Sequence, residues 1–74
     1  MIQIERHVML AGEIPGAGAL THDPTEPIYF YKSTDTETGK YLEVIARKTD
    51  VDNNKNGDEE IRKHIMRAYN KDNK

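Results

Sequence analysis

The chain has 74 residues, a formal net charge of −2 and no cysteine. A chain of this length forms one small domain (1–74), and its composition excludes both a disulfide scaffold and a strongly basic protein of the kind that coats nucleic acid. It has no apolar stretch near the roughly 18 residues that span a bilayer and no signal-peptide pattern, so we expect a cytoplasmic protein without a membrane partner.

Residues 1–10 alternate between apolar and other side chains. The apolar residues hold even positions: Ile2, Ile4, Val8 and Leu10. Arg6 interrupts this apolar face. Because a period of two is typical of a strand with one buried face, we expect a strand at about 1–10.

Residues 11–27 cannot form one regular element. They contain three Gly and three Pro, which mark turns. This composition predicts a long loop, and Ile14 and Leu20 are the apolar residues expected to anchor it to the core.

Two segments rich in aromatic and β-branched residues, at about 27–33 and 40–48, predict a β-hairpin. Gly39, in the polar connection, is free to adopt positive φ. Pairing Tyr31 with Tyr41 sorts the side chains of the hairpin into two faces. One face is apolar and consists of Ile28, Phe30, Leu42, Val44 and Ala46. The other consists of Tyr29, Tyr31, Tyr41, Glu43, Ile45 and Arg47.

Residues 58–71 have the pattern of an amphipathic helix. Asp58 is a good N-cap, and the acidic residues after it complement the positive end of the helix dipole. The apolar residues form one stripe at helical spacing: Ile61, Ile65, Ala68 and Tyr69. Packing this stripe on the apolar sheet face predicts an α+β domain. Its three-stranded antiparallel sheet (about 1–10, 27–33 and 40–48) packs on one C-terminal helix (about 58–71).

The sheet face away from this helix is the candidate binding surface. It consists of Tyr29, Tyr31, Tyr41, Ile45 and Arg47. Tyr and Arg are enriched in protein interfaces, and aromatic rings on a sheet also stack on unpaired bases. We predict a small non-enzymatic interaction or regulatory module, and we favour a protein partner, or a second copy of the chain, over nucleic acid. The alternative is a structural role, in which the 11–27 loop covers the rings or their hydroxyls face water.

The loop before the helix partly resembles an EF-hand calcium loop. Oxygen-bearing side chains alternate along it: Asp52, Asn54, Asn56 and Asp58. Ca²⁺ prefers six to eight oxygen ligands, but Lys63 stands where a bidentate Glu belongs. The alternative is a polar turn that ends in a helix cap, and we expect no cofactor.

Three segments are similar to the closing half of barnase/RelE-like nuclease domains of phage-type proteins: ALTHDPTEPIYFYKS, GKYLEVIARKT and IRKHIMRAYN. The resemblance implies a phage or mobile-element protein that cleaves RNA without a metal. The residues that match the family's His, basic and aromatic positions are His7, Lys32, Arg67 and Tyr69. In this alternative function a His deprotonates a 2′-hydroxyl while a nearby cation stabilises the phosphorane.

A nucleic-acid-binding domain is the third hypothesis. A basic patch is possible because several basic residues lie in the second half of the chain, among them Arg47, Lys48, Arg62, Lys63, Arg67 and Lys71. If they form one patch, binding would depend steeply on salt, because each phosphate neutralised releases counterions.

Overall fold

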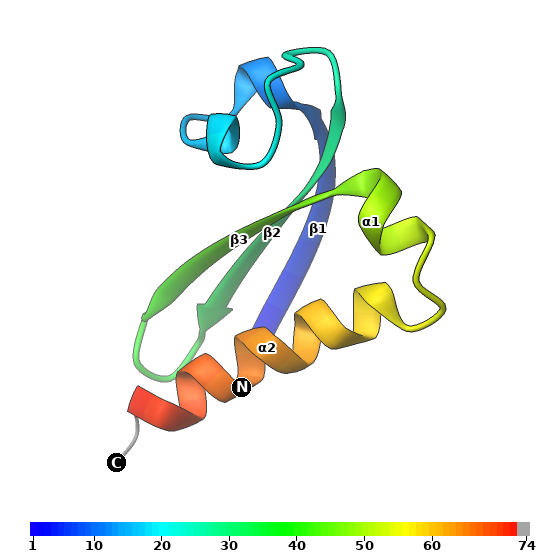
Figure 1. The fold of residues 1–74 in the computed structure, drawn as a ribbon. Helices are drawn as coiled ribbons and strands as arrows, with labels where there is room; N and C mark the ends of the chain where they lie inside the picture. The colour runs from blue at the N-terminus through cyan, green and yellow to red at the C-terminus, as the bar shows by residue number, and fades with distance from the viewer. Residues whose placement is uncertain (73–74) are drawn as a thin grey trace.

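The structure is a computed structural model that describes residues 1–72, with three antiparallel strands in one sheet and helices against one of its faces (Figure 1). β1 (Ile2–Leu10) and β3 (Tyr41–Arg47) flank β2 (Pro27–Asp35). After β3 come α1 (Lys48–Asp52) and α2 (Gly57–Asp72). The predicted α+β fold is confirmed, and the short helix α1 is an unpredicted addition. Neither helix has the length and hydrophobicity that crossing a membrane requires.

The hairpin of β2 and β3 has a different register from the predicted one. Tyr31 lies opposite Val44, three positions beyond the predicted Tyr41, which instead lies opposite Thr34. An odd offset moves every side chain of β3 to the other face relative to β2. The faces predicted for the hairpin are therefore wrong. Three β3 residues share a face with Tyr29 and Tyr31: Leu42, Val44 and Ala46.

The register differs because β2 continues through polar residues that the composition assigns to a loop. The Asp35 carboxylate accepts the Glu37 N–H at 2.9 Å, and the Asp35 N–H donates to the Lys40 carbonyl at 2.8 Å. Gly39, at φ 76°, donates its N–H to the Asp35 carbonyl at 2.8 Å. These bonds close the turn over 36–40, because Asp supports turns through its own side chain and Gly accepts positive φ.

Tyr29 and Tyr31 lie beneath the helices, so the expectation that they face away from the helix is wrong. Their buried cluster also contains Val51, Ile65 and Tyr69, and half-buried aliphatic residues surround it: Ile2, Ile4, Leu42, Val44, Ala46 and Ile61. The stripe predicted for α2 does face the sheet. The one aromatic residue of this stripe is Tyr69. Its hydroxyl lies 3.1 Å from Ser33 Oγ and donates to the Lys40 carbonyl at 3.2 Å.

The opposite face of the sheet is covered at one end by two 3-10 turns, Ala11–Glu13 and Ala17–Ala19, which lie away from α2 in Figure 1. This segment packs small apolar side chains on the sheet residues Ile28 and Phe30. The buried residues that it contributes are Ala11, Ile14 and Ala17. Ile14 therefore anchors the loop as predicted, whereas Leu20 is 36% exposed and does not.

A buried glycine joins the two helices. α2 begins at Gly57, one residue before the predicted start, and the Gly57 N–H donates to the Asn54 carbonyl at 3.0 Å. A Cβ at this position would lie 2.4 Å from the Val51 carbonyl oxygen, which is backbone and belongs to α1. Glycine is thus required by the close approach of the two helices.

Candidate functional site

The five residues predicted to form one binding face do not share a surface. Tyr29 is 6% exposed and Tyr31 is fully buried, both on the helix side. Tyr41, which is 46% exposed, lies on the opposite side of the sheet. On that side Ile45 packs against the cluster that contains the buried residues of segment 11–19. Arg47 forms two hydrogen bonds to the Asp50 carboxylate, at 3.1 and 3.2 Å. The predicted tyrosine face is therefore not a docking surface as a unit.

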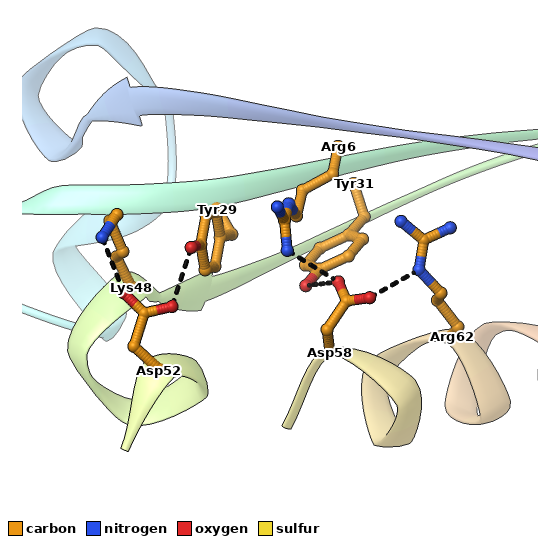
Figure 2. Close-up of polar contacts among 7 residues, drawn as sticks. All are labelled: Arg6, Tyr29, Tyr31, Lys48, Asp52, Asp58 and Arg62. Carbon is orange, nitrogen blue, oxygen red and sulfur yellow. Dashed lines mark hydrogen bonds and ion pairs between the residues drawn. The ribbon is translucent and has the colours of Figure 1, made fainter. Parts of the chain in front are cut away.

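The Tyr29 hydroxyl bonds the carboxylate at the end of α1. It donates to Asp52 Oδ1 at 2.8 Å, and Lys48 Nζ donates to Asp52 Oδ2 at 2.6 Å (Figure 2). The hydrogen bonds from Lys48 and Tyr29 lower the pKa of Asp52. The bond to this carboxylate and burial raise the pKa of Tyr29. This contact holds α1 against the sheet.

The Tyr31 hydroxyl bonds a second carboxylate, in the first turn of α2. It donates to Asp58 Oδ1 at 2.8 Å, Arg6 Nη1 donates to the same oxygen at 3.1 Å, and Arg62 Nε donates to Oδ2 at 2.8 Å. The Arg6 guanidinium also lies 4.4 Å from the centre of the Tyr29 ring. Figure 2 shows Arg6 between Tyr29 and Asp58. Arg6, which interrupts the apolar pattern of β1, thus connects both tyrosines to α2.

The pKa shifts in the carboxylate–tyrosine network of Figure 2 indicate that its hydrogen bonds hold the helices on the sheet. Burial and the bond to Asp58 raise the pKa of Tyr31 to about 12, so its hydroxyl keeps its proton at neutral pH. Partial burial acts to raise the pKa of Asp58, but the bonds from Arg62 and Tyr31 outweigh it and lower the pKa. The Asp58 carboxylate is ionised and already accepts from three donors, so it is not free to act as a general base.

Asp58 should make the fold sensitive to acid. Its pKa is lower in the folded chain than the value of about 3.9 expected in the unfolded chain. The ionised Asp58 carboxylate therefore stabilises the fold fully above about pH 4, and this stabilisation is lost as the pH falls through the pKa that Asp58 has in the folded chain. We expect the free energy of unfolding, measured with urea, to fall less between pH 5 and pH 3 in Asp58→Asn than in the unaltered protein. Equal losses in both proteins would contradict this assignment.

The loop that resembles a calcium site does not gather its oxygens around one point. Asp52 and Asp58 turn toward the sheet and bond tyrosine hydroxyls and cations. The Asn54 amide donates to Glu60 at 3.3 Å, and Asn54 Oδ1 accepts the Asn56 N–H at 3.2 Å. Within residues 1–72, no group of three His, Cys, Asp or Glu side chains is arranged to hold a metal ion. These contacts are those of the alternative interpretation, a polar turn that leads into a helix.

The four residues matched to the nuclease family are divided by the sheet. His7 and Lys32 lie on the face away from the helices. Arg67 and Tyr69 belong to α2, on the other side, and Tyr69 is 3% exposed and bonds Lys40 through its hydroxyl. The quartet therefore does not form one catalytic centre.

Several of the basic residues in the second half of the chain are neutralised by carboxylates. Lys48 pairs with Asp52, and Arg62 pairs with Asp58. The other pairs are Arg47 with Asp50 and Glu26, and Lys63 with Glu59. Four of the six residues considered for a basic patch thus have an acidic partner, which argues against one phosphate-binding patch made of these six.

The outer edge of β1, one of the two edge strands of the sheet, is a further candidate site. The Thr36 N–H donates to the Met1 carbonyl at one end of the β1–β2 ladder, and the Ala11 N–H donates to the Glu26 carbonyl at the other, both at 2.9 Å. Hydrogen-bonded pairs alternate in an antiparallel ladder. Odd-numbered residues of β1 therefore direct their main-chain groups to β2, and even-numbered residues direct theirs outward.

This edge is long, regular and apolar at one end. β1 pairs with β2 over nine consecutive positions without a bulge. Val8 is 57% exposed and Leu10 is 44% exposed, because α2 meets the sheet near Arg6 and leaves the far end of β1 uncovered. The Leu10 N–H is bonded to Glu13 Oε1 at 3.2 Å, so the outward donors of the edge end at Val8.

Within residues 1–72, fold and edge together define a small α+β domain whose edge strand β1 pairs with β2 on one side and with no strand on the other. No protein-family model, curated protein or solved structure matches the chain. Sequence reasoning missed this edge, although one signal was present. The even-numbered apolar residues of β1 show which side chains share a face, but only the ladder shows that the main-chain groups of the same residues point outward.

Proposed function

We propose that the chain is a small non-enzymatic, cytoplasmic interaction module that binds a protein partner by strand addition along β1. The observation that carries the proposal is the unpaired outer edge of β1, where the even-numbered residues from Ile2 to Val8 present main-chain donors and acceptors. Such an edge is a template for another strand. Main-chain hydrogen bonds supply affinity in this mode of recognition, and alternate side chains supply specificity.

Side chains along the edge favour a protein over nucleic acid. The exposed apolar residues Val8 and Leu10 have nothing to gain from a phosphate backbone, whereas they can pack on the side chains of an added strand. The cation that β1 itself carries on this face, Arg6, is already paired with Asp58 at 3.1 Å. Edges that proteins keep single usually carry a bulge, a proline or charged side chains. β1 has neither a bulge nor a proline, and of its two charged residues, Glu5 and Arg6, the arginine is paired with Asp58.

Substitution of Val8 by proline should abolish strand addition and spare the fold. The Val8 N–H points away from β2, so proline removes an outward donor without breaking the β1–β2 ladder. Peptides are selected from a random display library against the unaltered protein and then titrated calorimetrically. We expect Val8→Pro to weaken their binding by at least about tenfold, because it loses a hydrogen bond and its ring obstructs the incoming strand.

Val8→Thr is the matched control, since it keeps the β-branched shape and the N–H while losing apolar surface. We expect Val8→Thr to bind the same peptides within about threefold of the unaltered protein. Circular dichroism and the unfolding midpoint establish that both variants are folded. Selected peptides that bind Val8→Pro and Val8→Thr equally well would contradict the proposal, and so would a selection that enriches no peptide for a protein that is monomeric.

A further inference from the structure

The β1 edge is complementary to itself. We infer that a second copy of this chain occupies it, with the two β1 strands antiparallel about a two-fold axis at Arg6, so that two sheets join into one. This inference rests on the proposed function and names its partner. The two-fold axis is perpendicular to the sheet, so the helices of both copies lie on the same side and even-numbered residues meet even-numbered residues.

Side-chain pairing selects this register over its neighbours. With the axis at Arg6, Ile4 faces Val8 of the second copy and Ile2 faces Leu10, so apolar residues meet on the helix side. On the other face Glu5 faces His7 of the second copy, an acid beside a base. Moving the axis to Glu5 sets two glutamates against each other, and moving it to His7 sets Val8 against Arg6.

Main-chain groups agree with the same register. Even-numbered residues point outward, so the pair of Ile4 and Val8 and the pair of the two Arg6 residues are hydrogen-bonded, and the pair of Glu5 and His7 is not. The ladder ends beside Leu10, whose N–H is held by Glu13. Hydrogen bonding requires only that even-numbered residues pair with even-numbered residues, which an axis at Glu5, Arg6 or His7 satisfies, and side-chain pairing then selects Arg6.

Two arginines meet at the axis, and the structure already neutralises them. Each Arg6 donates to its own Asp58 at 3.1 Å and stacks on its own Tyr29, which draws the guanidinium over its own sheet (Figure 2). The charge nearest the axis is therefore that of an ion pair. Repulsion between the two copies is reduced accordingly.

Cysteine cross-linking tests the register directly, because the chain has no cysteine of its own. Glu5 and His7 have side chains that are 72% and 49% exposed, so Glu5→Cys and His7→Cys should leave the fold intact. In the inferred dimer these positions form a non-hydrogen-bonded pair with Cα atoms about 4.5 Å apart, within the range of a disulfide. Like positions lie diagonally, about 7–8 Å apart, which is too far.

The expected result is a disulfide-linked dimer when Glu5→Cys and His7→Cys are mixed under mild oxidation, and little dimer when either is oxidised alone. Efficient cross-linking of Glu5→Cys alone would place the axis elsewhere and overturn the register. The mixture is oxidised at about 0.5 mM protein, so that a weak dimer would be populated. If no disulfide-linked dimer forms there, the inference that a second copy is the partner is wrong.

Sedimentation equilibrium separates this inference from the proposed function. We expect the unaltered protein and Val8→Thr to sediment as dimers, and Val8→Pro to have a dissociation constant at least about tenfold higher. A monomeric protein whose peptide binding is lost in Val8→Pro would overturn the second copy while strand addition stands. A dimer that Val8→Pro leaves unchanged, with peptide binding equally unchanged, would overturn both.

Discussion

Replacing Gly57 by alanine should destabilise the protein by about 3 kcal/mol, near the upper end for overpacking a well-packed site. A Cβ there would lie 2.4 Å from the Val51 carbonyl oxygen and 3.0 Å from the Val51 carbonyl carbon. Both atoms are backbone, so no side-chain rotation relieves the clash, and α1 and α2 must move apart. A domain of 74 residues is expected to be stable by roughly 4–11 kcal/mol, so this loss is large.

Urea unfolding monitored by circular dichroism measures the effect of Gly57→Ala. Gly18→Ala is the matched control, because a Cβ at Gly18 has no atom within 4 Å and its φ is not positive. We expect the control to change the free energy of unfolding by less than about 0.5 kcal/mol. A Gly57→Ala protein as stable as Gly18→Ala would show that the α1–α2 junction is not packed as described.

Asp58→Ala is the second substitution with a large expected effect, about 2 kcal/mol of unfolding free energy. It removes the acceptor of the Tyr31 hydroxyl, which belongs to a fully buried residue, and leaves Arg6 without its ion-pair partner. An unsatisfied buried hydroxyl costs about 1–3 kcal/mol, and the part-exposed Arg6 adds less. The loss exceeds that of an ordinary surface substitution, because Asp58 links α2 to two strands.

Glu59→Ala is the control for the helix dipole, since Glu59 lies in the same first turn and its side chain is 64% exposed. We expect it to cost less than about 0.5 kcal/mol. A double-mutant cycle with Tyr31→Phe isolates the hydroxyl–carboxylate bond, and a coupling free energy of about 1 kcal/mol or more is expected. Additive effects of Asp58→Ala and Tyr31→Phe would mean that this bond contributes nothing to stability.

Local patterns in the sequence predict the elements of this fold, but not how the hairpin pairs. Periods of two and of 3.6 residues locate the strands and α2 to within a few residues, because they depend on neighbouring positions. Register depends on where the turn closes. Ser33 and Asp35 look like loop residues by composition, yet they continue β2 because Tyr69 and the Glu37 N–H satisfy their polar groups. Those partners cannot be read from local composition.

The location of the tyrosines could not be predicted for a related reason. A tyrosine on a sheet is equally consistent with an exposed face and with a buried one whose hydroxyl finds a partner. Tyr29 and Tyr31 find theirs in Asp52 and Asp58, which lie 23 and 27 residues away. No spacing rule connects residues so far apart. Arg6 was the available hint, since a charge in the middle of an apolar strand face needs an acid across from it.

The bond between Glu13 and the Leu10 amide limits the length of segment that this protein can recognise. Because the donor at Leu10 is occupied and the chain then turns into the 3-10 turn at Ala11, a docked strand meets usable amides along about seven residues, from Ile2 to Val8. A longer ligand would gain no further hydrogen bond from a β1 amide, and its extra residues could only pack on the Leu10 side chain. Trimming a selected peptide one residue at a time should therefore lower affinity most once it is shorter than this span.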